Sequence, residues 1–322
     1  MRHAMEDGGV LDEVLTVVGV DPGLPDRASQ SRSSSFFSAS ADPSYAGRVK
    51  LEGVGLRYGW RGPWVLRDVR LDLPPGRLIR VHGGNGSGKS TLLQVVAGAT
   101  RPGRGRVLAR PARTAYVPER FPPALPFTAL EYLRLMGRVH GLPGAETTRR
   151  GVRLLARFGA EGHADRPMAR LSKGMCQKVA VVQALVADPG LLVLDEAWTG
   201  LDTESRTALD EAVEERVAQG ATVVFVDHDP ARLTERTHLR WTVGGGTAAV
   251  TQQVAAAAVR IDCTGVKGGR EGLSALPGVR AVSTLADGGV RLETDETHSD
   301  ALLRALLAQP GTHIRRVSGG RR

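Results

Sequence analysis

The sequence predicts an α/β protein whose main sheet is mostly parallel. Strand and helix patterns alternate over roughly residues 48–245, and two expected strands, 191–194 and 222–226, are continuously apolar. A strand without polar alternation is typical of a parallel sheet that is covered on both faces. The alternation of strands with helices indicates the same architecture. We therefore expect a covered, largely parallel sheet as the core of the chain.

Two flanking regions differ from this core. Residues 1–46 contain a serine-rich stretch and no sustained period, which predicts a flexible tail. Residues 254–322 show the order β-α-β-β-α-β, which predicts a small ferredoxin-like α+β module. The predicted domains are a tail at 1–46, a main domain at 47–246 and an accessory domain at 254–322.

Local signals place the elements in chain order. Alternating strands at 48–58 and 64–73 come first, and a Pro-Pro-Gly turn leads into a third strand at 78–81. Short strands then follow at 106–109 and 114–117, and apolar periodicity predicts the helices at 127–140, 147–158, 171–186 and 204–219. In the accessory domain we expect strands at 254–261, 279–285, 290–294 and 313–317, with helices at 271–276 and 299–307.

Composition narrows the function classes. No apolar run approaches the roughly eighteen residues that span a bilayer, and the N-terminal residues do not read as a secretory signal, so we expect a cytoplasmic protein. Cys176 and Cys263 are too few for a disulfide framework. The net charge of +9 would permit nucleic-acid binding, but only five of the 43 basic residues are lysine and the arginines are scattered. We attribute the charge to compositional bias and expect no nucleic-acid partner.

Residues 81–93 match the phosphate-loop pattern, in which a glycine, four further residues and Gly-Lys-Ser lie between a strand and a helix. Glycines let successive backbone N–H groups turn toward phosphate oxygens, and the helix that begins here adds its dipole. Lys89 is expected to reach the outer phosphates and Ser90 to bind Mg²⁺. The predicted nucleotide-binding residues of this loop are Gly83, Gly84, Asn85, Gly86, Ser87, Gly88, Lys89, Ser90 and Thr91.

Two acids follow the apolar strand at 191–194, where a parallel sheet presents its ligand-binding edge. Asp195 is placed to hold Mg²⁺ through water. Glu196 is placed to polarise the water that attacks the outer phosphate. The alternative is a solvated acidic turn without a catalytic role. The presence of a phosphate loop in the same chain disfavours this alternative.

Three further stretches carry a family resemblance. Residues 171–175 read Leu-Ser-Lys-Gly-Met, residues 200–202 read Gly-Leu-Asp, and His228 follows the strand at 222–226. Together with the phosphate loop and the two acids, their order and spacing over residues 48–245 resemble the ATP-binding subunits of ATP-binding-cassette (ABC) transporters. The resemblance implies an antiparallel β subdomain and a helical subdomain beside the parallel core.

The resemblance also implies roles for single residues. Tyr58 corresponds to an aromatic that stacks on adenine, although core packing is an equal alternative for a strand tyrosine. Ser172 and Gly174 correspond to groups that meet the outer phosphate from the opposite subunit. Asp202 corresponds to a residue that communicates across the dimer, and His228 to one that contacts the outer phosphate.

Three departures from the family pattern are present. Glu119 stands where the family commonly has glutamine, and it still offers oxygen to the metal while adding negative charge. Lys173 and Met175 replace glycine and glutamine in the signature stretch. Ala197 and Trp198 replace the usual proline and hydroxyl residue, and we expect Trp198 close to the dimer surface without a physical account of its presence.

The resemblance predicts an ATPase that uses ATP and Mg²⁺, works as a homodimer and powers separate membrane-spanning permease subunits from the inner face of the membrane. Residues 121–142 are similar to the corresponding region of drug and antibiotic exporters, so we expect export of a drug, antibiotic or other hydrophobic compound. One alternative is a soluble cassette ATPase that acts on ribosomes or DNA. Another is a regulatory subunit that binds ATP without hydrolysing it.

Overall fold

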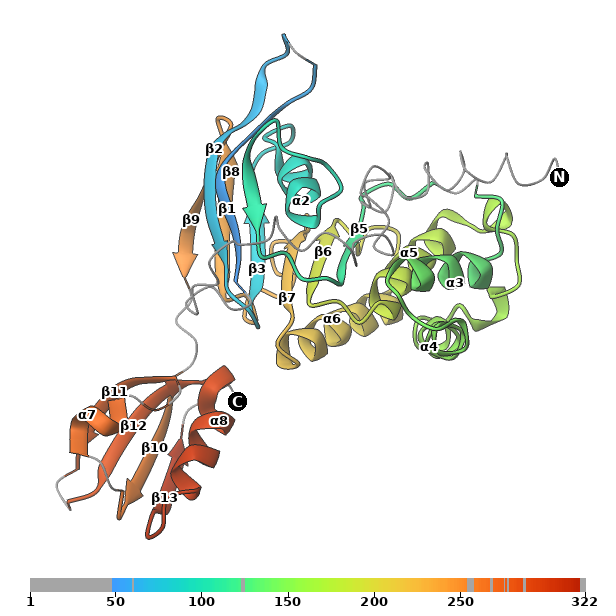
Figure 1. The fold of residues 1–322 in the computed structure, drawn as a ribbon. Helices are drawn as coiled ribbons and strands as arrows, with labels where there is room; N and C mark the ends of the chain where they lie inside the picture. The colour runs from blue at the N-terminus through green and yellow to red at the C-terminus, as the bar shows by residue number, and fades with distance from the viewer. Residues whose placement is uncertain are drawn as a thin grey trace, which may run out of the picture. The chain divides into compact units, whose positions relative to one another are not determined.

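The computed structural model describes residues 48–318 except 60, 123–124, 254–257, 267–268, 275, 277 and 286–287. The predicted tail at 1–46 lies outside the described residues. The chain divides into two compact units between Gln252 and Gln253 (Figure 1). Every helix among the described residues is too short or too polar to cross a bilayer.

The first unit is built on a six-stranded sheet in the order β5-β6-β7-β3-β8-β9. Its neighbouring pairs from β5 to β8 are parallel, which confirms the predicted parallel core. The strands β6, β7 and β3 are adjacent, so their carboxyl ends meet at one edge. The bounds are β3 (Leu78–His82), β5 (Thr114–Val117), β6 (Leu191–Asp195), β7 (Thr222–Val226), β8 (Leu239–Gly244) and β9 (Thr247–Gln253).

A three-stranded antiparallel sheet and one helix complete this half of the unit (Figure 1). The sheet has the order β2-β1-β4, with β1 (Val49–Arg57), β2 (Trp64–Leu73) and β4 (Arg104–Leu108). Apolar residues of both sheets and of helix α2 (Lys89–Ala97) form a single core, in which Leu66, Leu92 and Trp241 are fully buried. Burial of this core fixes α2, and with it the phosphate loop, against the parallel strands.

Helices on the other side form a second core with the same sheet. Helix α5 (Lys173–Val186) packs against α3 (Ala129–Val139) and α4 (Gly144–Arg157), and α6 (Thr203–Ala218) packs against β7. The start of α3 is set by a capping box, because Thr128 and Glu131 satisfy each other's backbone N–H groups. Short 3-10 turns, η3 (Glu161–His163) and η4 (Met168–Arg170), lead from α4 to α5.

The hairpin of β8 and β9 is not among the predicted strands, and it extends beyond residue 246, the predicted end of the main domain. Strand β9 continues to Gln253 and lies beside β8 at the sheet edge. Its small and polar residues carry no apolar alternation, so its pairing depends on the turn. That turn is formed by Gly245 and Gly246, whose φ values of 59° and 81° favour glycine in a tight hairpin.

The second unit has an antiparallel sheet in the order β11-β12-β10-β13 with two helices. This is the strand order of a split β-α-β, or ferredoxin-like, arrangement. Its core contains Val259, Ile261, Leu292, Leu302 and Leu306. The bounds are β10 (Ala258–Thr264), α7 (Gly269–Ser274), β11 (Val279–Thr284), β12 (Val290–Asp295), α8 (Glu296–Leu307) and β13 (His313–Ser318).

Candidate active site

The phosphate loop joins β3 to α2, as predicted. A Cβ atom at Gly83 would lie 2.4 Å from the carbonyl oxygen of Val243, so only glycine fits beside β8. Gly88 precedes the helix with a φ of 100°, which side chains rarely adopt. The glycines therefore hold an open loop whose backbone N–H groups lie at the N-terminus of α2, where an anion is stabilised.

Lys89 folds back over this loop. Its Nζ donates to the carbonyl oxygens of Gly83 and Gly84, each at 3.0 Å. The ammonium group therefore lies above the loop backbone, where it can meet a phosphate oxygen.

Tyr58 follows β1 and lies next to the start of α2. Its hydroxyl group is 3.1 Å from Thr91 Oγ1, and the residue is 59% exposed. This exposure rules out the alternative of core packing and leaves the ring open to a flat apolar ligand. The assignment to adenine stays a prediction.

Asp195, at the end of β6, lies beside the phosphate loop and is only 1% exposed. Its carboxylate accepts a hydrogen bond of 3.2 Å from the Tyr116 hydroxyl. Burial raises the pKa of Asp195 to about 6, while the Ser90 and Tyr116 hydrogen bonds oppose the shift and the charges of Glu119 and Glu196 add to it. The two predicted metal ligands are therefore close enough for Ser90 to lower the pKa of Asp195.

Glu196 and His228 also lie together. Glu196 Oε1 is 2.8 Å from His228 Nε2, and the side chains are 13% and 65% exposed, respectively. The backbone of Glu196 has a φ of 54° and its N–H donates to the carbonyl of Val226 at 3.0 Å. A positive φ at a glutamate is strained, and such strain is typical of functional sites. The parallel sheet thus brings the predicted catalytic pair to the edge where the phosphate loop lies.

Glu119 is exposed in the loop after β5. Its charge is among the influences that raise the pKa of Asp195, which places it in the same electrostatic environment. Its predicted contact with the metal stays a prediction.

The signature stretch at 171–175 belongs to a different part of the unit. Ser172 is the N-cap of α5, and its hydroxyl accepts from the Met175 N–H at 3.2 Å. A Cβ at Gly174 would be 2.8 Å from the carbonyl oxygen of Gly200, so glycine allows this loop to approach residues 200–202 closely. Helix α5 packs on α3 and α4, whereas the phosphate loop is attached to α2 and β3.

Asp202 has two partners within its own chain. It caps α6 by accepting from the Ser205 N–H at 2.8 Å, and it pairs with Lys178 Nζ at 2.7 Å. The Lys178 hydrogen bond, followed by the Ser205 backbone hydrogen bond, lowers the pKa of Asp202 below its usual range. Lys178 extends from α5, so this pair joins the signature helix to the 200–202 loop.

Replacement of Asp202 by alanine is expected to lower the free energy of unfolding by about 1–2 kcal/mol, the usual cost of losing a helix cap. Asp202→Ser retains an acceptor for the Ser205 N–H and should recover most of this loss. Urea unfolding of the three proteins measures both effects. Equal destabilisation by alanine and serine would contradict the capping role.

The expectation that Trp198 lies near a dimer surface is wrong. Trp198 is 2% exposed, its Nε1 donates to Asp210 Oδ1 at 2.8 Å, and its ring meets Phe225 edge-on at 5.6 Å. An indole is large enough to fill the space between β7 and α6 and needs one acceptor for its N–H. Trp198 is therefore a core residue, and Asp210 supplies its acceptor.

Sequence reasoning missed Tyr116, Lys178 and Arg80, all of which contact or hold site residues. Tyr116 could have been found as an aromatic side chain with a polar tip in a short strand that precedes 191–194 in the sequence. Lys178 and Arg80 carry no spacing signal, because their partners are remote in sequence.

A phosphate loop between a strand and a helix, with an acid at the end of a parallel strand of the same sheet, defines a P-loop nucleoside triphosphatase. Residues 66–199 match the family model described as "ABC transporter". The chain belongs to the family of ABC transporter ATP-binding subunits, and its fold confirms the predicted class. ATP hydrolysis coupled to transport is the activity of this family.

Known relatives match somewhat more than half of the chain. The zinc import ATP-binding protein ZnuC of Halorhodospira halophila is 37% identical over 185 residues, which are 56% of this chain and 68% of that protein. The Nod factor export ATP-binding protein I of Azorhizobium caulinodans is 36% identical over 203 residues, 58% of this chain and 62% of that protein. A solved ATP-binding subunit of an ABC transporter is 29% identical with a TM-score of 0.56, covering 63% of this chain and 90% of that one.

These relatives bear on the predicted alternatives. Both are named for transport, and neither supports a cassette acting on ribosomes or DNA. One is named for import and one for export, so they do not support the prediction of a drug exporter.

Proposed function

We propose that two copies of this chain form two composite ATP sites, each with a phosphate loop from one copy and a signature stretch from the other. The observation that supports the proposal is that the two halves have different partners within the chain. Lys89, Ser90, Asp195, Glu196 and His228 share one sheet edge, whereas Ser172 and Gly174 contact other parts of the unit. Binding of ATP between the copies would then bring the halves together.

The residues present suit Mg²⁺ as well as ATP. Mg²⁺ prefers oxygen ligands such as carboxylates and hydroxyls, and Ser90 is close enough to the Asp195 carboxylate to lower its pKa. Glu119 would add a further oxygen. When bound, Mg²⁺ would neutralise charge on the outer phosphates.

The contact between Glu196 and His228 suits the hydrolytic step. The Glu196 carboxylate would take a proton from water as the water oxygen bonds to the outer phosphorus and the bond to the ADP oxygen breaks. His228 would hold the carboxylate in position and donate to the phosphate. Lys89 would hold the phosphate oxygens during the transfer.

A mixing experiment tests the composite site. Lys89→Ala disables a phosphate loop and Ser172→Arg disables a signature stretch, so each variant alone should be inactive. A 1:1 mixture should recover about a quarter of wild-type ATPase activity, because half of the dimers contain one intact site and independent sites add. The control is each variant measured alone, which should stay inactive. A mixture without recovered activity contradicts the composite site.

The permease partner is proposed to bind near helix α3. A hollow of about 490 Å³ lies there, lined by Pro126, Phe127, Glu131, Arg134, Leu135, Arg138 and Gly144. Apolar side chains flanked by acidic and basic residues suit an amphipathic helix of a membrane subunit. The chain would then act at the cytoplasmic face of the membrane.

The proposal of export is supported by the sequence of residues 121–142 alone. The direction is a property of the complete transporter, so it is tested with the permease present. Uptake of a labelled hydrophobic compound into inside-out vesicles on addition of ATP indicates export. ATP-driven loss of the compound from such vesicles contradicts it.

A further inference from the structure

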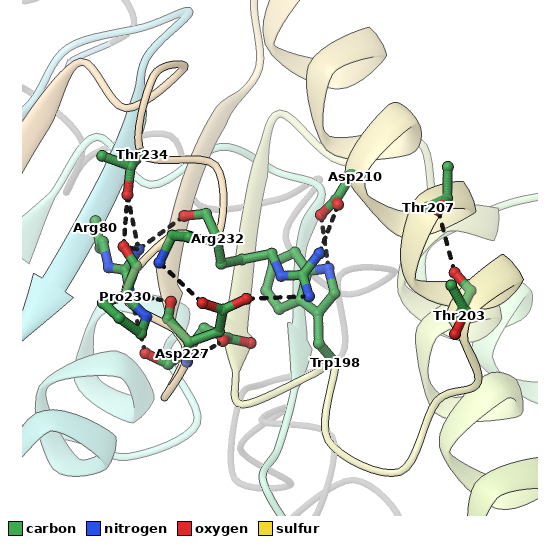
Figure 2. A network of polar contacts seen from close by, with 11 residues as sticks. Arg80, Trp198, Thr203, Thr207, Asp210, Asp227, Pro230, Arg232 and Thr234 are labelled. Atoms are coloured by element: carbon green, nitrogen blue, oxygen red, sulfur yellow. Dashed lines mark hydrogen bonds and ion pairs between the residues drawn. The ribbon is translucent and has the colours of Figure 1, made fainter.

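Arg80 is a buried arginine on β3, three residues before the phosphate loop (Figure 2). It is 1% exposed. Burial lowers the pKa of its guanidinium group, but an arginine in a protein keeps its charge. A buried charge must find partners, and the partners of Arg80 show what it does.

Its closest hydrogen-bond partners are carbonyl oxygens of one segment, residues 227–234, which we name the 227–234 loop. Nη2 donates to the carbonyls of Asp227 at 3.2 Å and Asp229 at 2.6 Å. Nη1 donates to the carbonyls of Pro230 at 3.0 Å and Arg232 at 2.7 Å. The loop is therefore folded around a single guanidinium group, as Figure 2 shows.

In the sequence, His228 lies between Asp227 and Asp229, whose carbonyls accept hydrogen bonds from Arg80 Nη2. Its side chain is 65% exposed, so packing around the imidazole does little to fix it. The backbone on either side is held by Arg80, and the imidazole still stands 2.8 Å from Glu196. The position of His228 is thus set largely through its backbone.

A second connection joins the same loop to the segment that carries Glu196. Arg232 Nη1 donates to Asp210 Oδ2 at 2.7 Å, and Asp210 Oδ1 accepts from Trp198 Nε1 at 2.8 Å (Figure 2). The Arg232 guanidinium also lies over the Trp198 ring, 5.8 Å from its centroid. Trp198 is two residues beyond Glu196 in the chain. The segments that carry Glu196 and His228 are therefore held by the same polar network.

We propose that Arg80 is a positioning residue for ATP hydrolysis, which ties the strand of the phosphate loop to the 227–234 loop and so places His228 against Glu196. This inference depends on the proposed function of His228. Arginine suits the task because its planar fork reaches carbonyls on two sides at once. A lysine ammonium keeps the charge but is a single point and cannot span the same carbonyls.

Steady-state ATPase measurements on the full chain test the inference with Arg80→Lys, His228→Ala and the double variant. We expect Arg80→Lys to lower kcat about tenfold, with KM for ATP within about twofold, because small misplacements of catalytic groups are costly. His228→Ala should lower kcat further. In the His228→Ala background, Arg80→Lys should have no added effect, since residues that act through one another are not additive.

Arg110→Lys is the matched control. Arg110 also donates to backbone carbonyls, those of Val95 and Val96 at 3.0 Å each, but it contacts the other end of α2. The kcat of Arg110→Lys should stay within about twofold of wild type, because this change does not alter the contacts of the 227–234 loop.

Three results overturn the inference. An unchanged kcat in Arg80→Lys, with His228→Ala impaired, removes the role of Arg80 and leaves the proposed function intact. Equal losses from Arg80→Lys with and without His228 show a role that is merely structural. A wild-type kcat in His228→Ala removes the proposed role of His228, and the role of Arg80 falls with it.

If Arg80→Lys fails to fold, Thr234→Val replaces it. Thr234 Oγ1 accepts from Arg80 at 3.4 Å and donates to the carbonyl of Pro230 at 2.6 Å. Loss of this hydroxyl loosens the loop while the guanidinium remains. We expect a kcat loss of about threefold that disappears in the His228→Ala background, by the same non-additivity. A loss that persists there, or no loss, overturns the inference.

Discussion

Glu196→Gln should lower the rate of ATP hydrolysis by at least about 100-fold, since a general base commonly contributes 10²–10⁴. The amide has the shape of the carboxylate and can still accept from His228 Nε2, but it cannot take the proton of the attacking water. ATP affinity should not fall, because a negative charge near the triphosphate is removed. ATP would therefore bind, and the variant would accumulate as an ATP-bound dimer.

Two measurements check this expectation. Phosphate release gives the rate, and size-exclusion chromatography with Mg²⁺ and ATP gives the oligomeric state. Glu214→Gln is the matched control, because Glu214 is a glutamate of α6 that pairs with Arg236 at 3.3 Å, away from the site. It should match the wild type in both measurements. Hydrolysis by Glu196→Gln at the wild-type rate would show that another group takes the proton.

The elements of the catalytic edge could be predicted because their signals are local. The phosphate loop has its glycines, lysine and serine within a few residues, and the strands at 191–194 and 222–226 are continuously apolar. Acids and histidines that follow such strands must emerge at the edge where parallel strands end. The meeting of Glu196 with His228 follows from the pairing of β6 with β7.

Residues that hold the site in place could not be predicted in this way. Arg80 is separated by about 150 residues from the carbonyls that it binds, and a backbone carbonyl has no residue type that a pattern could match. Trp198 was misplaced for a related reason. Its acceptor, Asp210, lies on a helix whose rotation relative to β7 is decided only by packing.

Asp195→Asn should stabilise the protein in the absence of nucleotide while abolishing its Mg²⁺-dependent hydrolysis. In the native state burial raises the pKa of Asp195 to about 6. Its ionisation at neutral pH therefore costs on the order of 3 kcal/mol of stability, and a neutral amide avoids this cost. The same change removes a carboxylate that the proposed function assigns to Mg²⁺, so stability and activity should move in opposite directions.

The pH dependence separates this cause from a general packing effect. Because the native pKa is raised, the native state binds more protons than the unfolded state between about pH 4 and 6, so this carboxyl reduces stability as pH rises through that window. The gain in Tm from Asp195→Asn should thus be small near pH 4 and complete above about pH 6. Tyr116→Phe is the opposing control, since it removes a hydrogen bond that lowers the pKa of Asp195 and should reduce Tm at neutral pH. A gain in Tm that is the same at pH 5 and pH 7.5 would contradict the electrostatic origin.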